Sequence, residues 1–144
     1  MKAIIISIAL ACALAGCATQ NVAGTASYQL VPQDRVIGTI AQPSENEPFG
    51  TVVVKRDPGL FGAALSSVLL LDGKPAARIK PGEFIEFRSQ PGEHILGVSW
   101  SDNLGAAATS STRELAVEIR PGQTYYFRVF PQAGSGVVIE RASQ

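Results

Sequence analysis

The chain has 144 residues, 46% of them hydrophobic, with twelve basic and twelve acidic side chains and a formal net charge of zero. This length fits one domain, and the sequence lacks the basic blocks with which proteins bind nucleic acids. With two cysteines and one histidine, it offers few ligands for a metal site.

The first predicted element is an N-terminal signal. Lys2 gives a positive start, residues 3–14 form an apolar run, and small residues lead into a cysteine in Leu14-Ala15-Gly16-Cys17. This layout is typical of a secretory signal peptide, because the run is shorter than the roughly 20 residues of a transmembrane helix. We therefore expect residues 1–16 to be a signal peptide. Plain cleavage would leave Cys17 as a free thiol.

The ending Leu-Ala-Gly-Cys resembles the lipobox of bacterial lipoproteins. The resemblance implies a diacylglyceryl group and usually an N-acyl chain on Cys17, enough for stable membrane attachment. Ala18, where aspartate would favour the inner membrane, implies the outer membrane of a Gram-negative source, facing the periplasm. The inner membrane and the cell surface are the less favoured locations. Since Cys12 leaves with the signal and Cys17 carries lipid, no disulfide is expected.

Residues 17–48 are predicted to be the lipidated N-terminus and a tether. The stretch is rich in Ala, Gln, Asn, Ser and Pro, and it ends in a breaker cluster at residues 43–48. Two apolar patches within it, residues 28–31 and 35–40, are candidates for marginal edge strands. If wholly flexible, a tether of about 30 residues has a root-mean-square reach of roughly 30 Å.

From residue 49 onward, apolar and polar residues alternate in one short segment after another, which predicts a β-sandwich domain over residues 49–144. The expected strands are residues 51–56, 68–71, 76–80, 84–88, 95–100, 114–119, 125–129 and 137–141. A period of two is typical of half-buried antiparallel strands. Ile85 and Phe87, for example, alternate with Glu86 and Arg88.

Turn residues separate these segments. Asp72-Gly73 is typical of a tight hairpin, and Pro-Gly precedes a strand at residues 81–82, 91–92 and 121–122. Seven or eight short strands with such turns predict an all-β antiparallel sandwich, with a barrel as the alternative closure.

Three motifs carry a second resemblance. They are LDGK at residues 71–74, PGEHIL at residues 91–96 and RPGQTYYF at residues 120–127. In this order they resemble the PEGA-like domain of small bacterial lipoproteins, a family of unknown function, over about residues 52–130. The resemblance implies an immunoglobulin- or transthyretin-like sandwich and no catalytic residue.

His94 is the one histidine of the chain. The simpler interpretation is a strand-start histidine packed at a turn, and the alternatives are a ligand, a proton switch or a catalytic base. Ser–His–Asp catalysis requires a nucleophile and one of three aspartates beside it: Asp57, Asp72 or Asp102. If His94 lies against Trp100 with no carboxylate or hydroxyl in reach, this chemistry is excluded. A glycosidase pair is a further option among three glutamates: Glu83, Glu86 and Glu93.

Two other features are candidates for partner binding. Residues 57–65 are apolar and glycine-rich, and are either additional core or an exposed loop. The loop residues expected to bind are Leu60, Phe61 and Leu65. Tyr126 and Arg128 share the strand face opposite Tyr125, and with His94 they are candidates for a recognition surface. The alternative for Tyr126 and Arg128 is a cross-strand pair on a solvated sheet face.

Together these patterns predict a membrane-anchored periplasmic lipoprotein that acts as a non-catalytic binding or scaffold module of the bacterial envelope. Its expected partner is an envelope protein or glycan, and no cofactor is expected beyond the lipid on Cys17. Two alternatives stay open. One is an envelope hydrolase that uses His94 with an acidic neighbour, and the other is a self-associating structural lipoprotein with open sheet edges.

Overall fold

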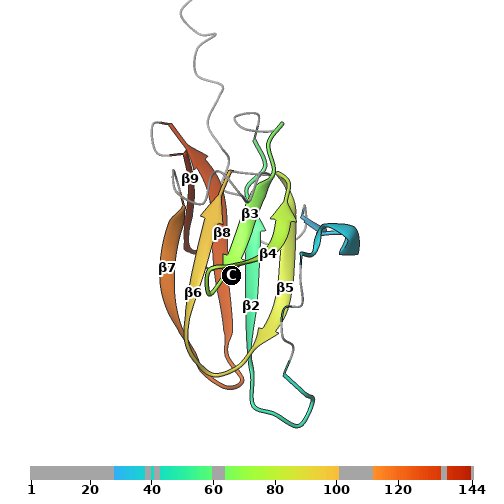
Figure 1. Ribbon diagram of the computed structural model, residues 1–144, viewed down its shortest axis with the longest axis vertical. Coiled ribbons are helices and arrows are strands. Elements are labelled where there is room, and N and C mark those ends of the chain that lie inside the picture. Colours follow the sequence, from blue (N-terminus) through green and yellow to red (C-terminus); the bar gives the residue numbers. More distant parts are fainter. Residues whose placement is uncertain are drawn as a thin grey trace, which may run out of the picture.

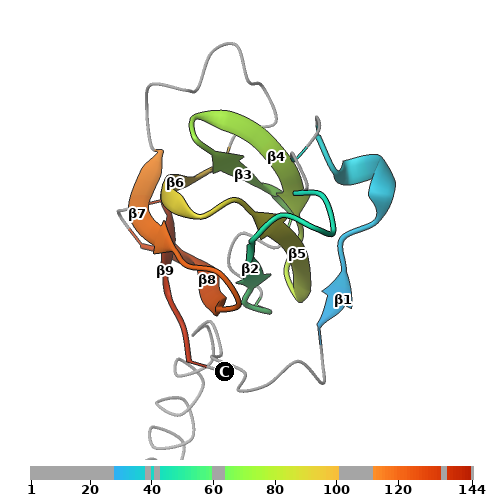
Figure 2. The same ribbon diagram turned by 90° about the horizontal axis from the view of Figure 1, so that it is seen from below.

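The structure, a computed structural model, describes residues 28–37, 40, 43–59, 64–100, 112–133 and 136–143. Its elements are β1 (Gln29–Leu30), the 3-10 helix η2 (Gln33–Arg35), β2 (Gly50–Arg56), β3 (Ser67–Leu71), β4 (Lys74–Ile79), β5 (Glu83–Ser89), β6 (Gly92–Ser99), β7 (Arg113–Ile119), β8 (Thr124–Gln132) and β9 (Gly136–Arg141). The strands form two facing layers (Figure 1, Figure 2), which confirms the predicted all-β sandwich. No helix within these ranges has the length and apolarity to cross a membrane.

One sheet has five strands in the order β1-β5-β2-β8-β9, and the other has four in the order β4-β3-β6-β7. Most neighbouring strands are antiparallel, as the alternation predicted. Two pairs differ, because β1 runs parallel to β5 and β2 runs parallel to β8. Parallel neighbours require a long connection, and here β3 to β7 separate β2 from β8 along the chain.

The core lies between the two sheets and is filled by the inward-facing member of each alternating pair. Ile85 and Phe87 of β5 are 4% and 2% exposed, whereas Glu86 and Arg88 are exposed on the other face. The same alternation buries residues of every strand from β2 to β9. Each fully buried Val, Leu, Ile or Phe contributes about 1.5–3 kcal/mol, so the sandwich is held together without a disulfide among the described residues.

The turns follow from their residue types. Asp72 and Gly73 have φ angles of 51° and 74°, as a tight hairpin turn between β3 and β4 requires. Gly82 and Gly122 each follow a proline and have φ angles of 76° and 69°, the values of the third residue of a type II turn.

The segment before β2 corrects the expected tether at residues 17–48. The predicted patch at residues 28–31 does form an edge strand, since β1 pairs with β5, and Val31 is 4% exposed in the core. The second patch contributes a bridge between Val36 and Ala77. Figure 2 shows this segment along the side of the sandwich next to β5 and β4. The described residues 28–37 therefore pack with the sandwich, because apolar side chains of this segment complete the core.

Candidate functional site

The structure separates the residues that the sequence singled out for binding. Three of them lie outside the described residues: Cys17, Leu60 and Phe61. Leu65 is 49% exposed and lies two residues before β3. His94 lies on β6 of the four-stranded sheet, whereas Tyr126 and Arg128 lie on β8 of the five-stranded sheet. These three residues therefore do not form one surface.

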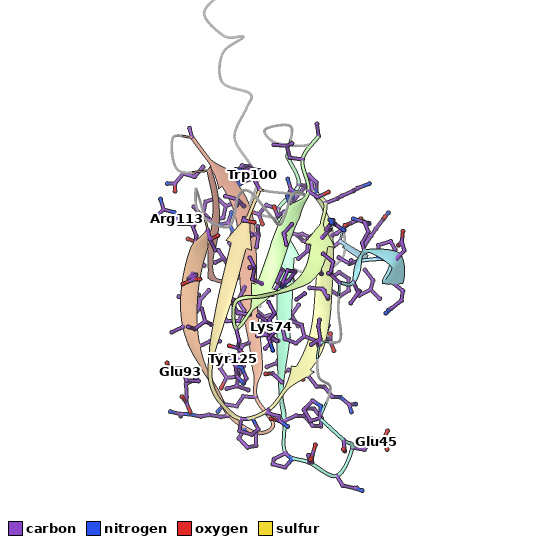
Figure 3. All side chains as sticks on the ribbon, viewed as in Figure 1. Glu45, Lys74, Glu93, Trp100, Arg113 and Tyr125 are labelled. Carbon is purple, nitrogen blue, oxygen red and sulfur yellow. The ribbon has the colours of Figure 1, made fainter. Side chains whose placement is uncertain are left out.

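His94 lies near the start of β6, with its ring between two turns. Its Nδ1 is 2.8 Å from Oδ2 of Asp72 in the β3–β4 turn, and its Nε2 is 3.2 Å from Oγ of Ser89 at the end of β5. Trp100 lies at the opposite end of β6 (Figure 3). The condition that would exclude a hydrolase is thus not met, because both a carboxylate and a hydroxyl are within reach of the ring.

Asp72 is held in place by the backbone of β6. Its Oδ1 accepts a hydrogen bond from the Ile95 amide at 2.8 Å, and its own amide donates to the Ile95 carbonyl at 2.8 Å. Partial burial opposes ionisation of this carboxyl group, but the hydrogen bonds from Ile95 and His94 hold the pKa of Asp72 below its ordinary value of 3.8. Asp72 is therefore an ionised acceptor that orients the histidine ring.

A third partner of the ring decides what this arrangement can do. Nε2 is 3.0 Å from the carbonyl oxygen of Gln90, closer than it is to Ser89. A catalytic base needs an unprotonated Nε2 that accepts the serine proton. Here Nε2 also faces the Gln90 carbonyl, which can only accept a hydrogen bond, so an Nε2–H that donates to this oxygen cannot take the serine proton. Because Ser89 is also only 4% exposed, the geometry favours a hydrogen-bonded clamp between two turns over an activated nucleophile.

A second polar cluster lies on the outer face of the five-stranded sheet. We call it the Tyr28 cluster, and it consists of Tyr28, Lys55, Asp57, Tyr126 and Arg128. Arg128 forms an ion pair with Asp57, and the Tyr28 hydroxyl donates to Asp57 at 3.3 Å. The Lys55 ammonium group is 5.7 Å from the ring centroid of Tyr28 and 5.4 Å from that of Tyr126. This cluster joins the entering chain to β2 and β8.

Burial raises the pKa values of two residues in the Tyr28 cluster. The side chain of Asp57 is 1% exposed, and burial raises its pKa although Arg128 and Tyr28 act against the shift. Burial and the nearby Asp57 carboxylate raise the pKa of Tyr28 to about 12. On this sheet face, Arg128 therefore pairs with a buried carboxylate, and the Tyr126 ring lies next to the Lys55 ammonium group.

Arg56 is a residue that the sequence analysis did not single out. It is completely buried, and its Nη1 donates to the carbonyl oxygens of Leu65 at 2.6 Å and Ile79 at 2.7 Å. Its guanidinium carbon is 5.3 Å from the centroid of the Trp100 ring. Burial lowers the pKa of Arg56 to about 10, so the group remains charged near neutral pH. The sequence pattern could have revealed Arg56, because it lies two residues after Val54 and so shares the inward face of the strand.

Arg35 and Glu83 form an ion pair that the sequence did not indicate. Arg35 Nη1 is 2.7 Å from Glu83 Oε2, and a second contact joins Nη2 to Oε1. The amide of Lys80 also donates to Glu83, at 2.8 Å. Glu83 points inward on β5, whereas Glu86 is exposed on the opposite face, so these two do not form the carboxylate pair of a glycosidase.

The described side chains include no group of three or more His, Cys, Asp or Glu residues that could hold a metal ion. A scan against known protein families finds no match for the chain, and a search of curated proteins finds none either. The function must therefore be argued from the sequence and from the geometry of the sandwich.

Proposed function

We propose that this protein is a lipid-anchored, non-catalytic binding or scaffold module of the bacterial envelope. In this proposal Cys17 carries the lipid, the outer membrane holds the anchor, and the sandwich faces the periplasm to bind an envelope protein or glycan. The signal layout and the lipobox resemblance support the anchor. The resemblance to PEGA-like lipoproteins supports the combination of an anchor with a small sandwich.

The observation that carries this proposal is the position of the two ends of the described domain. Tyr28 joins the Tyr28 cluster, and near the other end the Ala142 amide donates to the Tyr126 carbonyl at 2.8 Å. Both ends therefore leave the sandwich on the side of the five-stranded sheet, away from β4-β3-β6-β7 (Figure 2). An anchor reached through Tyr28 leaves the four-stranded sheet as the side that is presented to partners.

The chemistry of the polar residues supports binding rather than catalysis. The buried charged groups Asp57 and Glu83 each pair with an arginine and join two chain segments. His94 holds two turns together, with the Gln90 carbonyl at the nitrogen that a catalytic base would use. Such groups stabilise loops and edges, which are where binding residues of a sandwich usually lie.

The anchor is tested by replacing each cysteine in turn. In a Gram-negative host, the wild-type chain should incorporate labelled palmitate and remain with outer membranes through a high-salt wash, until detergent releases it. Cys17→Ser should abolish both properties. Cys12→Ser is the matched control, because it removes the other cysteine of the chain and should change neither. Membrane retention and labelling of the Cys17→Ser variant would refute the proposed anchor.

One observation favours a second candidate, an envelope hydrolase. The contacts of His94 with Asp72 and Ser89 have the order of a catalytic triad, provided that Nε2 accepts from Ser89 rather than facing Gln90. The purified lipoprotein should be assayed on activated esters and on peptidoglycan fragments. Activity that is lost in Ser89→Ala but kept in Ser99→Ala, another buried serine, would establish the hydrolase. An equal background in all variants leaves the binding module as the function.

A further inference from the structure

We propose that the free edge of β7 is the docking site for an extended, basic segment of a partner protein, which pairs with β7 as a fifth strand of the four-stranded sheet. This inference rests on the proposed function, because it names the part of the presented sheet that binds and the chemistry of what it binds. Strand addition of this kind takes affinity from backbone hydrogen bonds and specificity from alternate side chains.

β7 is an edge strand of the four-stranded sheet. β7 pairs with β6 over seven residues, from Ile119 to Arg113, without a register shift. No other described strand pairs with β7, although β9 of the facing sheet contacts it across the sandwich. Figure 1 shows β7 at the margin of the molecule, and Figure 3 shows Glu93 and Arg113 near the two ends of the β6–β7 pair. Half of the backbone N–H and C=O groups of such a strand point away from the sheet.

Two of the other three described sheet edges are protected by means that β7 lacks. At the β4 edge, Val36 forms a bridge to Ala77, and the Ile37 amide donates to the Ala76 carbonyl at 2.8 Å. β4 also contains Pro75, which has no amide hydrogen to offer an added strand. β1 is only two residues long. The third edge, β9, has six residues and no proline, and its exposed Glu140 pairs with Arg128. β7 has seven residues and no proline, so it is the longest unprotected template for another strand among the described edges.

The solvent-facing side of this edge carries negative charge. On the outward face of β7, exposed Ala116 lies between exposed Glu114 and Glu118. On β6, Glu93 lies opposite Glu118, and Ile95 lies opposite Ala116 and is 40% exposed. Two glutamates directly across an antiparallel pair repel each other, which costs stability. No ion pair of the described residues involves any of these three glutamates.

This row of side chains specifies the occupant. An added strand places every second side chain beside the outward row of β7. A lysine or arginine beside Glu118, an apolar residue beside Ala116 and a second basic residue beside Glu114 complement the row at each position. The basic residues would also relieve the repulsion between Glu118 and Glu93. A single exposed ion pair adds little affinity, but reversing both charges replaces two attractive contacts with two repulsive ones, so the pairs together set the register and reject acidic segments.

A second copy of this chain fits the same edge poorly. Two β7 strands that pair antiparallel about Ala116 would bring Glu114 of each copy opposite Glu118 of the other. Like charges would then meet at both ends of the pairing, an arrangement that opposes edge-to-edge association. Complementary charge therefore favours a basic partner segment over self-association.

The experiment uses the full mature lipoprotein in detergent, labelled with 15N, and a synthetic peptide Thr-Lys-Thr-Val-Thr-Lys-Thr as the probe. We expect the peptide to shift the backbone amide resonances of β7 in a saturable way. The double variant Glu114→Lys and Glu118→Lys should bind it at least about tenfold more weakly. The matched control is Glu86→Lys, because Glu86 is exposed on the opposite sheet and should leave binding unchanged. A peptide with glutamate in place of lysine should bind only the double variant.

Four results would overturn the docking site. They are the absence of β7 shifts up to the solubility limit of the peptide, equal binding of the lysine and glutamate peptides, equal loss in Glu86→Lys, and a concentration-dependent dimer that shifts the β7 amides without peptide. None of these results moves the protein off the membrane or removes its lipid. Failure of this inference is therefore distinguishable from failure of the proposed anchor, which the cysteine variants report.

Discussion

Replacing Val31 by alanine tests whether the segment before β2 belongs to the folded domain. Val31 is 4% exposed, while its neighbour Leu30 is 61% exposed. Val31→Ala removes two buried carbons, at about 0.8 kcal/mol each, and leaves a small cavity whose cost adds to this. We expect the free energy of unfolding to fall by about 2 kcal/mol. Leu30→Ala, which removes a larger but exposed side chain, should change it by less than about 0.5 kcal/mol.

Urea unfolding at equilibrium, followed by the fluorescence of Trp100, measures both variants. Trp100 is the one tryptophan of the chain and packs against the core, so its emission reports loss of the sandwich. The thermal midpoint of Val31→Ala should also fall, by roughly 5–10 °C for a domain of this size. If Val31→Ala matches Leu30→Ala, the segment does not fold with the sandwich, and the inference that residues 28–37 pack with it is wrong.

Other predictions concern pH and close packing. Asp72 and Glu83 have folded-state pKa values below the ordinary 3.8 and 4.5, so their stabilisation is complete above about pH 5 and is lost as the pH falls below 4.5 through the folded values. Urea midpoints measured across this range should fall, and a flat profile would contradict the assignment. Burial raises the pKa of Tyr28 from 10.0 to about 12, so its contribution is complete below pH 10 and is lost as the pH rises towards 12. Tyr28→Phe should remove this loss of stability at alkaline pH. If the variant unfolds at the same alkaline pH as the wild type, the role given to Tyr28 is wrong. Gly50→Ala should lower the free energy of unfolding by about 1–3 kcal/mol, because its Cβ would lie 2.8 Å from the Arg120 carbonyl oxygen. Thermal unfolding measures this loss, and an unchanged midpoint would mean that the backbone shifts to make room.

The strands could be predicted because each is long enough for alternation to show which side faces the core. On β5, the two apolar residues Ile85 and Phe87 are inside and the charged residues between and after them are outside. The β3–β4 hairpin was visible for a different reason, since Asp72-Gly73 adopts a backbone conformation that few other residue pairs accept. Both signals are local, so they are visible in neighbouring residues of the sequence without knowledge of the rest of the fold.

The sequence could not assign the polar contacts, although Asp72 was one of three aspartates considered for His94, because the partners are far apart in the chain. Arg35 meets Glu83 across 48 positions, and His94 meets Asp72 across 22. A two-residue strand such as β1 is also too short to show a period. The sequence therefore indicated no more than marginal edge strands within a tether, and only the packed sandwich shows which side chains residues 28–37 reach.

Docking of residues 28–37 has a consequence for how far the proposed anchor lets the sandwich travel. Ten residues, 18–27, separate Cys17 from Tyr28. If wholly flexible, ten residues have a root-mean-square reach of roughly 17 Å, against roughly 30 Å for 30 residues, and the volume that they can sweep is about fivefold smaller. The local concentration of the sandwich in the layer next to the membrane rises by the same factor. A partner held at the same membrane would therefore meet this domain far more often than one across the periplasm.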